Sequence, residues 1–383
     1  MTPATRTVAT MSSRRGTGRL VPVRLPAPEA EAVIQAAWDA GDAVLVLDPR
    51  APEREIQGIL APMRPEAGVE PEVAAVVVTS GTAGAPKGVE LTWDGLAASS
   101  AAVAAALEIG PIDRWLACLP FHYVAGLAVL GRGWATGTPV TVVGGFDVAT
   151  VAGADATLVS LVPTMVRRLR EAGADLQRFR KILLGGGPVR EEGPNIIGTY
   201  GLTETWGGVV HDGHPLDGVE LSLGDRDEIL VRGPMLMRGY RLAPEATAAA
   251  FTADGWLRTG DAGTIDAHGR LRVVDRLRDL IITGGVNVSP SEVEAVLGHH
   301  PGVADVAVGG APDPEWGERV VAYIVPRTPA APPALADLRA FAADRLSAPK
   351  LPRELVVVGS IPRTSGGKVV RRLLGPDWDQ DVE

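Results

Sequence analysis

The chain of 383 residues is 46% hydrophobic and 22% charged, and its 37 basic and 46 acidic side chains give a net charge of −9. This length is more than one hydrophobic core usually serves, so two domains are expected. The acidic balance argues against a broad nucleic-acid-binding surface. Cys118 is the only cysteine, which excludes an intramolecular disulfide and a cysteine-rich zinc site and fits a reducing, cytoplasmic compartment. The apolar runs are too short to span a bilayer, so no membrane insertion is expected.

The first two-thirds of the chain alternate between short apolar runs and helical patterns. Apolar runs bounded by Gly, Pro or Asp predict buried strands at residues 43–47, 74–78, 115–119, 140–143, 157–162 and 182–184. Helices are predicted at residues 29–40, 93–107 and 163–171, the last with Pro163 in its first turn. The alternation predicts an α/β fold with parallel sheets.

The pattern changes after about Gly213. Short strands separated by turn residues, at 220–223, 228–231 and 271–274, predict a small β-rich subdomain. The remaining residues predict a β-α-β-β-α-β lobe, with elements at 280–283, 289–297, 303–308, 319–325, 334–346 and 354–358. We therefore expect an N-terminal domain over residues 1–275, an α+β C-terminal domain over residues 276–383, and a hinge near the charged residues 276–279.

A segment rich in glycine and hydroxyl residues follows the strand predicted at 74–78 and precedes a helical run. It reads Thr79-Ser80-Gly81-Thr82-Ala83-Gly84-Ala85-Pro86-Lys87-Gly88. Glycines let backbone N–H groups approach an anion, hydroxyls add donors, and Lys87 adds a positive charge, as a polyphosphate requires. It is not a Walker loop, because Pro86 precedes the lysine and Gly88 follows it. An arbitrary loop of this composition is merely flexible, but ten matching residues after a strand favour phosphate binding.

Two acidic motifs follow. In Tyr200-Gly201-Leu202-Thr203-Glu204-Thr205, a carboxylate beside a phosphate loop suits Mg²⁺, which takes one or two carboxylates plus phosphate oxygens. In Trp256-Leu257-Arg258-Thr259-Gly260-Asp261, a fixed carboxylate can accept hydrogen bonds from both ribose hydroxyls. Taken alone, Glu204 is more often a solvated surface acid, and a Gly-Asp pair is more often an ordinary turn.

Two further motifs lie toward the C-terminus. Arg276-Leu277-Arg278-Asp279-Leu280-Ile281-Ile282-Thr283-Gly284-Gly285-Val286-Asn287-Val288 runs into Ser289 and Glu292, which predict a capping box at the start of a helix. Pro362-Arg363-Thr364-Ser365-Gly366-Gly367-Lys368 comes close to the end of the chain. Alone, such a lysine usually belongs to a disordered tail.

The five motifs, in this order and at these separations, resemble the adenylate-forming superfamily of acyl-CoA synthetases, non-ribosomal-peptide adenylation domains and luciferases. The resemblance runs from about Ala74 to Arg372. It implies an ATP-dependent ligase that converts a carboxylate to an acyl-AMP and then passes the acyl group to CoA. It also implies Mg²⁺ as cofactor and a small, mobile C-terminal domain that closes over the site.

The resemblance implies a role for individual residues around ATP. Contacts to the β- and γ-phosphates are implied for Thr79, Ser80, Gly81, Thr82, Gly84 and Lys87. The walls around adenine are implied to be Gly186, Gly187, Pro188, Tyr200 and Gly201. Thr203 is implied to contact the α-phosphate, Glu204 to hold Mg²⁺, and Asp261 to bind the ribose with Arg276 close by.

The C-terminal domain is implied to supply the catalytic lysine, Lys368, which bridges the attacking carboxylate and the α-phosphate. Arg278 stands at the family's hinge position, where Asp or Lys is usual. Gly284 and Gly285 are implied to face the pantetheine tunnel, and His122 to line the acyl or CoA pocket or else to be structural.

The acyl substrate is suggested by two segments, residues 119–127 and 160–164, and by the short length before the phosphate loop. Both the two segments and this short length resemble the short 2-succinylbenzoate–CoA ligases of menaquinone biosynthesis. Met165, however, stands where glutamine is common in those ligases. The alternatives are a CoA ligase for another aryl or fatty carboxylate, an enzyme that loads a carrier protein, or a catalytically impaired homologue that only binds nucleotide. Whether the protein forms a homodimer stays open.

Two further expectations concern individual segments. Residues 181–184 and 195–198 resemble consecutive parallel strands, yet only ten residues, 185–194, join them, too few for the usual crossover helix. The histidines without metal-binding spacing are expected in loops or at the surface: His211, His214, His268, His299 and His300. Trp206 either touches the acyl pocket or packs in the core.

Overall fold

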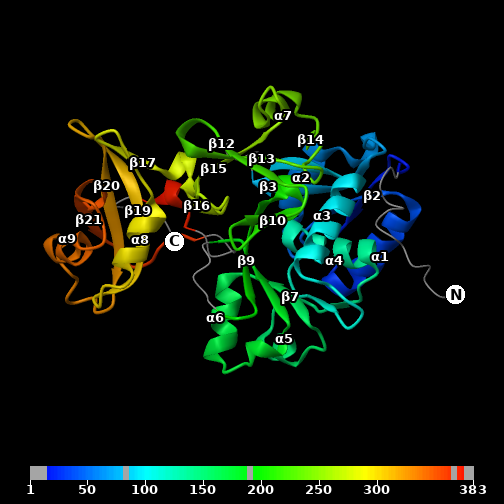
Figure 1. Cartoon of the computed structure of the whole chain (residues 1–383), viewed down its shortest axis with the longest axis horizontal. Helices are drawn as coiled ribbons and strands as arrows, with labels where there is room; N and C mark the ends of the chain where they lie inside the picture. The colour runs from blue at the N-terminus through cyan, green and yellow to red at the C-terminus, as the bar shows by residue number, and fades with distance from the viewer. Residues whose placement is uncertain (1–14, 81–85, 188–192, 364–368, 375–383) are drawn as a thin grey trace. The chain divides into compact units, whose positions relative to one another are not determined.

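The computed structural model describes residues 15–80, 86–187, 193–363 and 369–374 (Figure 1). Backbone contacts divide the chain into two compact units. The first comprises Met1–Ser222, Leu230–Thr259 and Ala267–Leu271, and the second comprises Leu223–Ile229, Gly260–Asp266 and Arg272–Glu383. The predicted boundary between residues 275 and 276 and the hinge at 276–279 stay predictions.

The first unit contains a five-stranded sheet near the N-terminus. Its order is β1 (Leu20–Val23), β2 (Ala43–Val46), β3 (Val73–Ser80), β4 (Pro86–Thr92) and β14 (Gly239–Tyr240). β1, β2 and β3 run parallel, whereas β4 is antiparallel to both β3 and β14. β4 was not expected, because Lys87 and Glu90 interrupt its apolar pattern. Glu90 is nevertheless buried, and two arginines, Arg238 and Arg241, neutralise it.

A seven-stranded sheet forms the rest of the α/β core. Its order is β11 (His214–Pro215), β10 (Gly207–His211), β9 (Ile196–Leu202), β8 (Lys181–Leu184), β7 (Leu158–Leu161), β5 (Trp115–Ala117) and β6 (Val140–Val142). The strands from β9 to β6 are parallel, and β10 is antiparallel to β9. The expected parallel pairing of β8 with β9 is confirmed, since Ile182 lies opposite Ile196. The described parts of the short connection, 185–187 and 193–194, are not helical.

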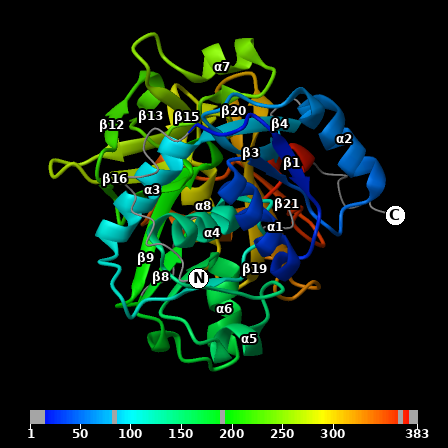
Figure 2. The same cartoon turned by 90° about the vertical axis from the view of Figure 1, so that its right-hand side faces the viewer.

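Three helices, α1 (Ala27–Ala40), α3 (Trp93–Ala106) and α4 (Val124–Thr136), pack between these sheets (Figure 1). α1 and α3 contact both sheets, and α4 packs against α3 and the seven-stranded sheet. Figure 2 shows the three helices as one row. α3 and α4 are rich in small residues, and a side chain on Gly131 would meet Leu96 at 2.7 Å. Small residues therefore let these two helices approach closely.

The outer faces of both sheets are covered by shorter helices. α2 (Glu53–Met63) buries Ile56 and Met63 against the five-stranded sheet. α5 (Val148–Gly153) and α6 (Pro163–Glu171) bury Val151, Val166 and Leu169 against the seven-stranded sheet. Helices thus cover both faces of each sheet, as the nearly continuous apolar runs of the central strands require.

The predicted β-rich subdomain is a four-stranded sheet. Its order is β12 (Glu220–Leu223), β13 (Glu228–Arg232), β15 (Leu257–Ile265) and β16 (Leu271–Arg276). A short helix, α7 (Pro244–Ala250), follows β14 and begins at a proline, which suits the first helical turn.

The second unit contains the predicted C-terminal lobe with one additional strand. Its strands are β17 (Ile281–Thr283), β18 (Val286–Val288), β19 (Val303–Asp313), β20 (Gly317–Pro326) and β21 (Glu354–Val357), and its helices are α8 (Pro290–Leu297) and α9 (Leu335–Ala343). The unexpected strand is β18, which pairs with β17 through a tight hairpin. Only half of the predicted capping box of α8 is present: the Ser289 hydroxyl accepts a hydrogen bond from the Glu292 N–H, whereas the Glu292 carboxylate accepts from Lys350. α8 and α9 cover one face of this sheet.

Arg180 ties three segments of the first unit together. Its guanidinium donates to both carboxylate oxygens of Asp113, at 2.9 and 2.7 Å, and to the carbonyl of Leu107 at the end of α3. Asp113 also accepts from the Gly110 N–H and the Thr157 hydroxyl. Burial opposes ionisation of Asp113, but these donors outweigh it, so the pKa of Asp113 lies below its ordinary value.

Asp113→Asn is expected to lower the free energy of unfolding by about 2 kcal/mol, because it leaves a largely buried guanidinium without its counter-charge. Urea unfolding followed by tryptophan fluorescence measures this. The control is Asp155→Asn, which breaks a pair with Arg114 whose acid is 93% exposed, and should change stability by less than about 0.5 kcal/mol.

The contribution of Asp113 to the free energy of unfolding depends on pH, and the shift of its pKa gives the direction. Since the native pKa of Asp113 is lower than its unfolded value, its contribution is complete above the unfolded value and is lost as pH falls through the native one. The stability difference between wild type and Asp113→Asn should therefore shrink at acidic pH. A difference that stays constant with pH would contradict this account.

Candidate active site

A short turn after β9 presents Glu204. The 3-10 turn Thr203–Thr205 directly follows the strand, and Thr205 is fully buried beneath it. The Thr205 hydroxyl oxygen lies 2.7 Å from the Gly207 carbonyl oxygen and accepts the Leu202 N–H at 3.0 Å. These contacts fix the turn from inside and leave the neighbouring Glu204 side chain at the surface of the site. Sequence reasoning missed the role of Thr205.

The structure brings Glu204 and Lys87 together around Tyr240. The Tyr240 hydroxyl donates to Glu204 Oε1 at 2.8 Å, and Lys87 Nζ lies 4.8 Å from the centre of the Tyr240 ring. Burial, and then the negative charge of Glu204, raise the pKa of Tyr240 well above its ordinary value, so the phenol stays protonated and donates. Tyr240 was not among the residues expected in the site.

The described residues of the predicted phosphate-binding segment lie on two paired strands, β3 and β4. Thr79 on β3 lies opposite Lys87 on β4, and Ser80 lies opposite Pro86. The predicted helix after this segment is confirmed as α3, which begins directly after β4. Three expected phosphate contacts lie outside the described residues: Gly81, Thr82 and Gly84. Lys87 is therefore held on a paired strand, where its position is better fixed than in a loop.

The predicted adenine walls follow neighbouring strands of the seven-stranded sheet. Gly186 and Gly187 come directly after β8, and Tyr200 and Gly201 lie near the end of β9. A side chain on Gly201 would lie 1.9 Å from the Gly207 carbonyl oxygen, so only glycine fits there. Pro188 lies outside the described residues. The carboxyl ends of parallel strands are where open α/β sheets bind ligands.

Asp261 and Arg276 form an ion pair on adjacent strands of the four-stranded sheet. Arg276 Nε lies 2.8 Å from Asp261 Oδ1, and the aspartate side chain is only 7% exposed. Asp261 lies within β15 and not in the ordinary turn that its Gly-Asp sequence suggests. A cation therefore orients this carboxylate, and its contact with the ribose stays a prediction.

The remaining predicted residues of the second unit have these positions. Arg278 lies in the 3-10 turn Leu277–Asp279, is 62% exposed and lies 3.6 Å from Asp279. Gly284 and Gly285 have positive φ values of 57° and 78° and form the turn between β17 and β18. That turn alone requires glycines, whatever else they do. Lys368 lies outside the described residues.

His122 is largely buried before α4. Its Nε2 lies 3.9 Å from Asp48 Oδ2, and its ring centre lies 4.3 Å from that of Tyr123, with the two ring planes tilted by 54°. Burial lowers the pKa of His122, which the nearby Asp48 offsets only in part, so the ring is neutral near pH 7. A neutral, oriented imidazole suits either a pocket wall or a structural role.

A buried polar cluster behind the Thr203–Thr205 turn was not predicted. It consists of Arg132 on α4 with Thr199 and His211 on paired strands β9 and β10. Arg132 Nε, the Thr199 hydroxyl and both ring nitrogens of His211 are buried without a hydrogen-bond partner among the described residues. A side chain on Gly207 would lie 3.5 Å from Arg132 Nη2, so the guanidinium lies directly beneath the backbone that follows Trp206.

The cluster has one positive charge and no carboxylate. Burial lowers the pKa of Arg132 to about 10, which leaves it protonated at neutral pH. Burial, and then the charge of Arg132, lower the pKa of His211 to about 4, so His211 is neutral. The expectation that His211 lies at the surface is wrong. The sequence feature that could have revealed this cluster is Arg132, a single arginine within an otherwise apolar helix.

Trp206 packs in the core. It is fully buried, and its indole N–H donates to the Thr92 carbonyl at 3.0 Å, where β4 meets α3. A side chain on Gly95 would meet its ring at 2.9 Å. Trp206 therefore anchors the Glu204 turn to β4.

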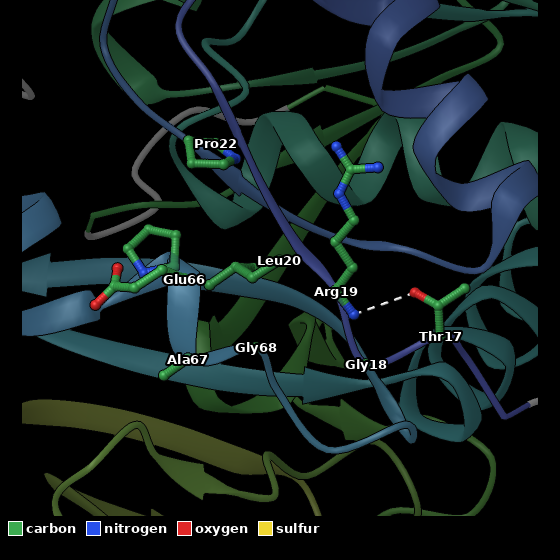
Figure 3. A pocket seen from close by; sticks show the side chains of 9 residues that line it. Thr17, Gly18, Arg19, Leu20, Pro22, Glu66, Ala67 and Gly68 are labelled. Carbon is green, nitrogen blue, oxygen red and sulfur yellow. Dashed lines mark hydrogen bonds between the residues drawn. The ribbon is translucent and has the colours of Figure 1, made fainter.

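Two surface hollows lie apart from the predicted site residues. Figure 3 shows a shallow cleft of about 570 Å³ beside β1, lined by Thr17, Gly18, Arg19, Leu20, Pro22, Pro65, Glu66, Ala67 and Gly68. A second hollow of about 360 Å³ lies between α3 and β10–β11, and His211 is part of its wall. The cleft of Figure 3 contains none of the residues that the motifs identify.

Whether the site residues can hold Mg²⁺ depends on the carboxylate of Glu204. The described residues contain no group of three or more His, Cys, Asp or Glu side chains able to hold a metal. Mg²⁺ bound together with a nucleotide, however, needs only one or two carboxylates plus phosphate oxygens. Tyr240 occupies only one oxygen of Glu204, so the other is available and the residues fit the ion. Within the described residues, no helix is long and apolar enough to cross a membrane.

Thr205→Val is expected to lower the free energy of unfolding by about 2 kcal/mol, because the Leu202 N–H and the Gly207 carbonyl lose their buried partner. Thr205→Ser keeps the hydroxyl and should cost less than about 1 kcal/mol. Urea unfolding of both variants measures the difference. A larger loss in Thr205→Ser than in Thr205→Val would mean that the methyl group, and not the hydrogen bonds, fixes the turn.

The comparisons with known proteins agree with this geometry. Residues 62–241 match the AMP-binding enzyme family, and residues 292–368 match the AMP-binding enzyme C-terminal domain. The chain is 38% identical to a probable 2-succinylbenzoate–CoA ligase of Mycobacterium tuberculosis (strain H37Rv), over 92% of this chain and 97% of that protein. It is 34% identical to the 2-succinylbenzoate–CoA ligase of Bacillus subtilis (strain 168), over 88% of this chain and 78% of that protein.

Solved structures give the same result. O-succinylbenzoate CoA synthetase (MenE) from Bacillus subtilis, in complex with the acyl-adenylate intermediate OSB-AMP, matches with a TM-score of 0.82 and 29% identity, over 96% of this chain and 90% of that chain. ATP-bound MatB from Rhodopseudomonas palustris matches with a TM-score of 0.84 and 25% identity, over 99% of this chain and 92% of that chain. The chain therefore belongs to the AMP-binding enzyme family of adenylate-forming proteins.

Proposed function

We propose that this protein is a 2-succinylbenzoate–CoA ligase. It converts 2-succinylbenzoate, ATP and CoA to 2-succinylbenzoyl-CoA, AMP and pyrophosphate through an acyl-adenylate. Membership of the AMP-binding enzyme family supports the reaction class, and the relatives that carry this enzyme name support the substrate.

The reaction has two group transfers. A carboxylate oxygen attacks the α-phosphorus of ATP, and the bond to pyrophosphate breaks. The thiol of CoA then attacks the acyl carbon, loses its proton and displaces AMP. Both reactants of the first step are anions, so positioning and charge neutralisation contribute more than covalent help. Mg²⁺ at Glu204 would supply part of that neutralisation when bound.

The residues of this chain divide the remaining tasks. Lys87, fixed on β4, binds the β- and γ-phosphates together with the segment after Ser80. Thr203 contacts the α-phosphate beside Glu204, and Asp261, oriented by Arg276, binds the ribose. Lys368 neutralises charge on the reacting oxygens. These roles follow from the motifs and are proposals.

The observation that supports 2-succinylbenzoate as the substrate is the buried charge of Arg132. The described residues provide it with no carboxylate, although removing a charge from water costs several kcal/mol unless a partner compensates. 2-Succinylbenzoate has two carboxylates, of which only one is activated. The other is a matched partner for Arg132.

A coupled assay tests the proposed function directly. It measures pyrophosphate release and thioester formation from ATP, Mg²⁺ and CoA with 2-succinylbenzoate, against benzoate, medium-chain fatty acids and a carrier protein as acceptor. We expect turnover to be highest with 2-succinylbenzoate and CoA. A higher rate with another acid would overturn the assignment of 2-succinylbenzoate as the substrate. Background rates with every acid would identify an impaired homologue.

Arg132→Met is expected to lower kcat/KM for 2-succinylbenzoate about 100-fold, the effect of losing one hydrogen-bonded ion pair. The KM for ATP should not change. With 4-oxo-4-phenylbutanoate, which lacks the ring carboxylate, wild type and variant should react equally slowly. The control is Arg168→Met, at an exposed position of α6. A loss of the same size with both acids would contradict pairing between Arg132 and the second carboxylate.

Lys368→Ala is expected to abolish acyl-AMP formation and to spare CoA transfer from supplied acyl-AMP, because only the first step brings two anions together. ATP–pyrophosphate exchange measures the first half-reaction, and thioester formation from synthetic 2-succinylbenzoyl-AMP measures the second. Equal loss of both half-reactions would contradict this role of the lysine.

A further inference from the structure

Tyr240 contacts two side chains that the proposed reaction uses for different purposes. We propose that Tyr240 is a positioning residue, which holds Glu204 in the orientation that binds the metal ion of MgATP and keeps Lys87 apart for the phosphates. This inference rests on the proposed function. Sequence motifs did not identify Tyr240, because it belongs to the two-residue strand β14.

The backbone places Tyr240 beside Lys87. Tyr240 lies opposite Val89 in the antiparallel pair of β14 and β4. Lys87 is two residues before Val89 and therefore lies on the same face of the sheet, diagonally across from Tyr240. Diagonal neighbours of this kind are within reach of long and aromatic side chains. The observed 4.8 Å from Lys87 Nζ to the ring centre is a cation–π contact.

The backbone also fixes Tyr240 relative to Glu204. The Met237 N–H donates to the carbonyl of Glu204 at 2.7 Å, three residues before Tyr240. The Tyr240 N–H donates to the Thr247 hydroxyl at 2.8 Å, which holds β14 against the start of α7. With both sides fixed, the Tyr240 hydroxyl reaches Glu204 Oε1 at 2.8 Å.

The arrangement keeps two opposite charges from neutralising each other. A direct ion pair between Lys87 and Glu204 would occupy the carboxylate that a metal needs and the ammonium that phosphates need. Within the described residues, neither side chain has an ion-pair partner, and both contact Tyr240 instead. A neutral donor leaves the negative charge of Glu204 intact, and the ring face leaves the positive charge of Lys87 intact. Loss of a hydrogen-bonding partner of a metal-binding side chain typically weakens metal binding 10–100-fold.

The two contacts of Tyr240 can be removed separately. Tyr240→Phe removes the donor and keeps the ring, whereas Tyr240→Leu removes both. Calorimetry measures the binding of α,β-methylene-ATP to each variant, once with Mg²⁺ and once with EDTA. The ratio of the two affinities reports the contribution of the metal, and the affinity in EDTA reports the phosphate contacts. Glu204→Gln sets the scale for complete loss of the metal contribution.

In Tyr240→Phe, we expect the gain in nucleotide affinity that Mg²⁺ provides to be about tenfold smaller than in wild type. The affinity for the nucleotide in EDTA should not change. Tyr240→Leu should lose the same gain and should also bind the nucleotide more weakly in EDTA, because Lys87 loses its contact with the aromatic ring. The control is Tyr323→Phe, the same change on a largely buried ring in the second unit, which should behave as wild type. An undiminished Mg²⁺-dependent gain in Tyr240→Phe would overturn the positioning role alone. Failure of the wild-type protein to bind the nucleotide in either buffer would overturn the proposed function.

Discussion

The buried ion pair between Arg241 and Glu90 is the constraint on which the site depends. Arg241 is only 5% exposed, contacts Glu90 at 3.1 Å and donates to the carbonyls of Met63, Arg64 and Gly68. A two-residue strand such as β14 has too few ladder hydrogen bonds to hold itself in place. Arg241 anchors its end to α2 and β4, and thereby fixes the adjacent Tyr240. The positions of Lys87 and Glu204 around Tyr240 follow from this anchor.

The buried or partly buried arginines of the first unit have two kinds of surroundings. Arg180 and Arg241 have carboxylate partners and carbonyl acceptors within the fold, so their charges are compensated before any ligand arrives. Arg132 has neither among the described residues; its guanidinium lies 5.8 Å from the centre of the Trp115 ring, and the nearby His211 is neutral. An uncompensated buried charge costs stability, which a binding site recovers when an anion arrives. This contrast is the physical reason for the proposal that Arg132 recognises the substrate, whereas the other two arginines stabilise the fold.

The same short-range rules recur in both units. Thr205 fixes the turn that carries Glu204, Arg276 orients Asp261, and Ser289 caps α8. In each case a neighbouring side chain limits the freedom of a residue that the motifs identify or of the helix that follows them. Among the described residues predicted to act on ATP, Lys87, Tyr200 and Asp261 are carried by hydrogen-bonded strands, which reduces the reorganisation needed when a ligand binds.

The sequence by itself determined the α/β fold, most strands of the core, the parallel pairing of β8 and β9 and the family, because apolar runs, caps and ordered motifs are local patterns. It missed β4, since Lys87 and Glu90 are polar, and only the tertiary structure shows that Arg238 and Arg241 neutralise Glu90. Arg132, His211 and Tyr240 were also missed or misplaced. Their partners lie far away along the chain, and contacts between such residues depend on strand register and packing, which no local pattern of residue types encodes.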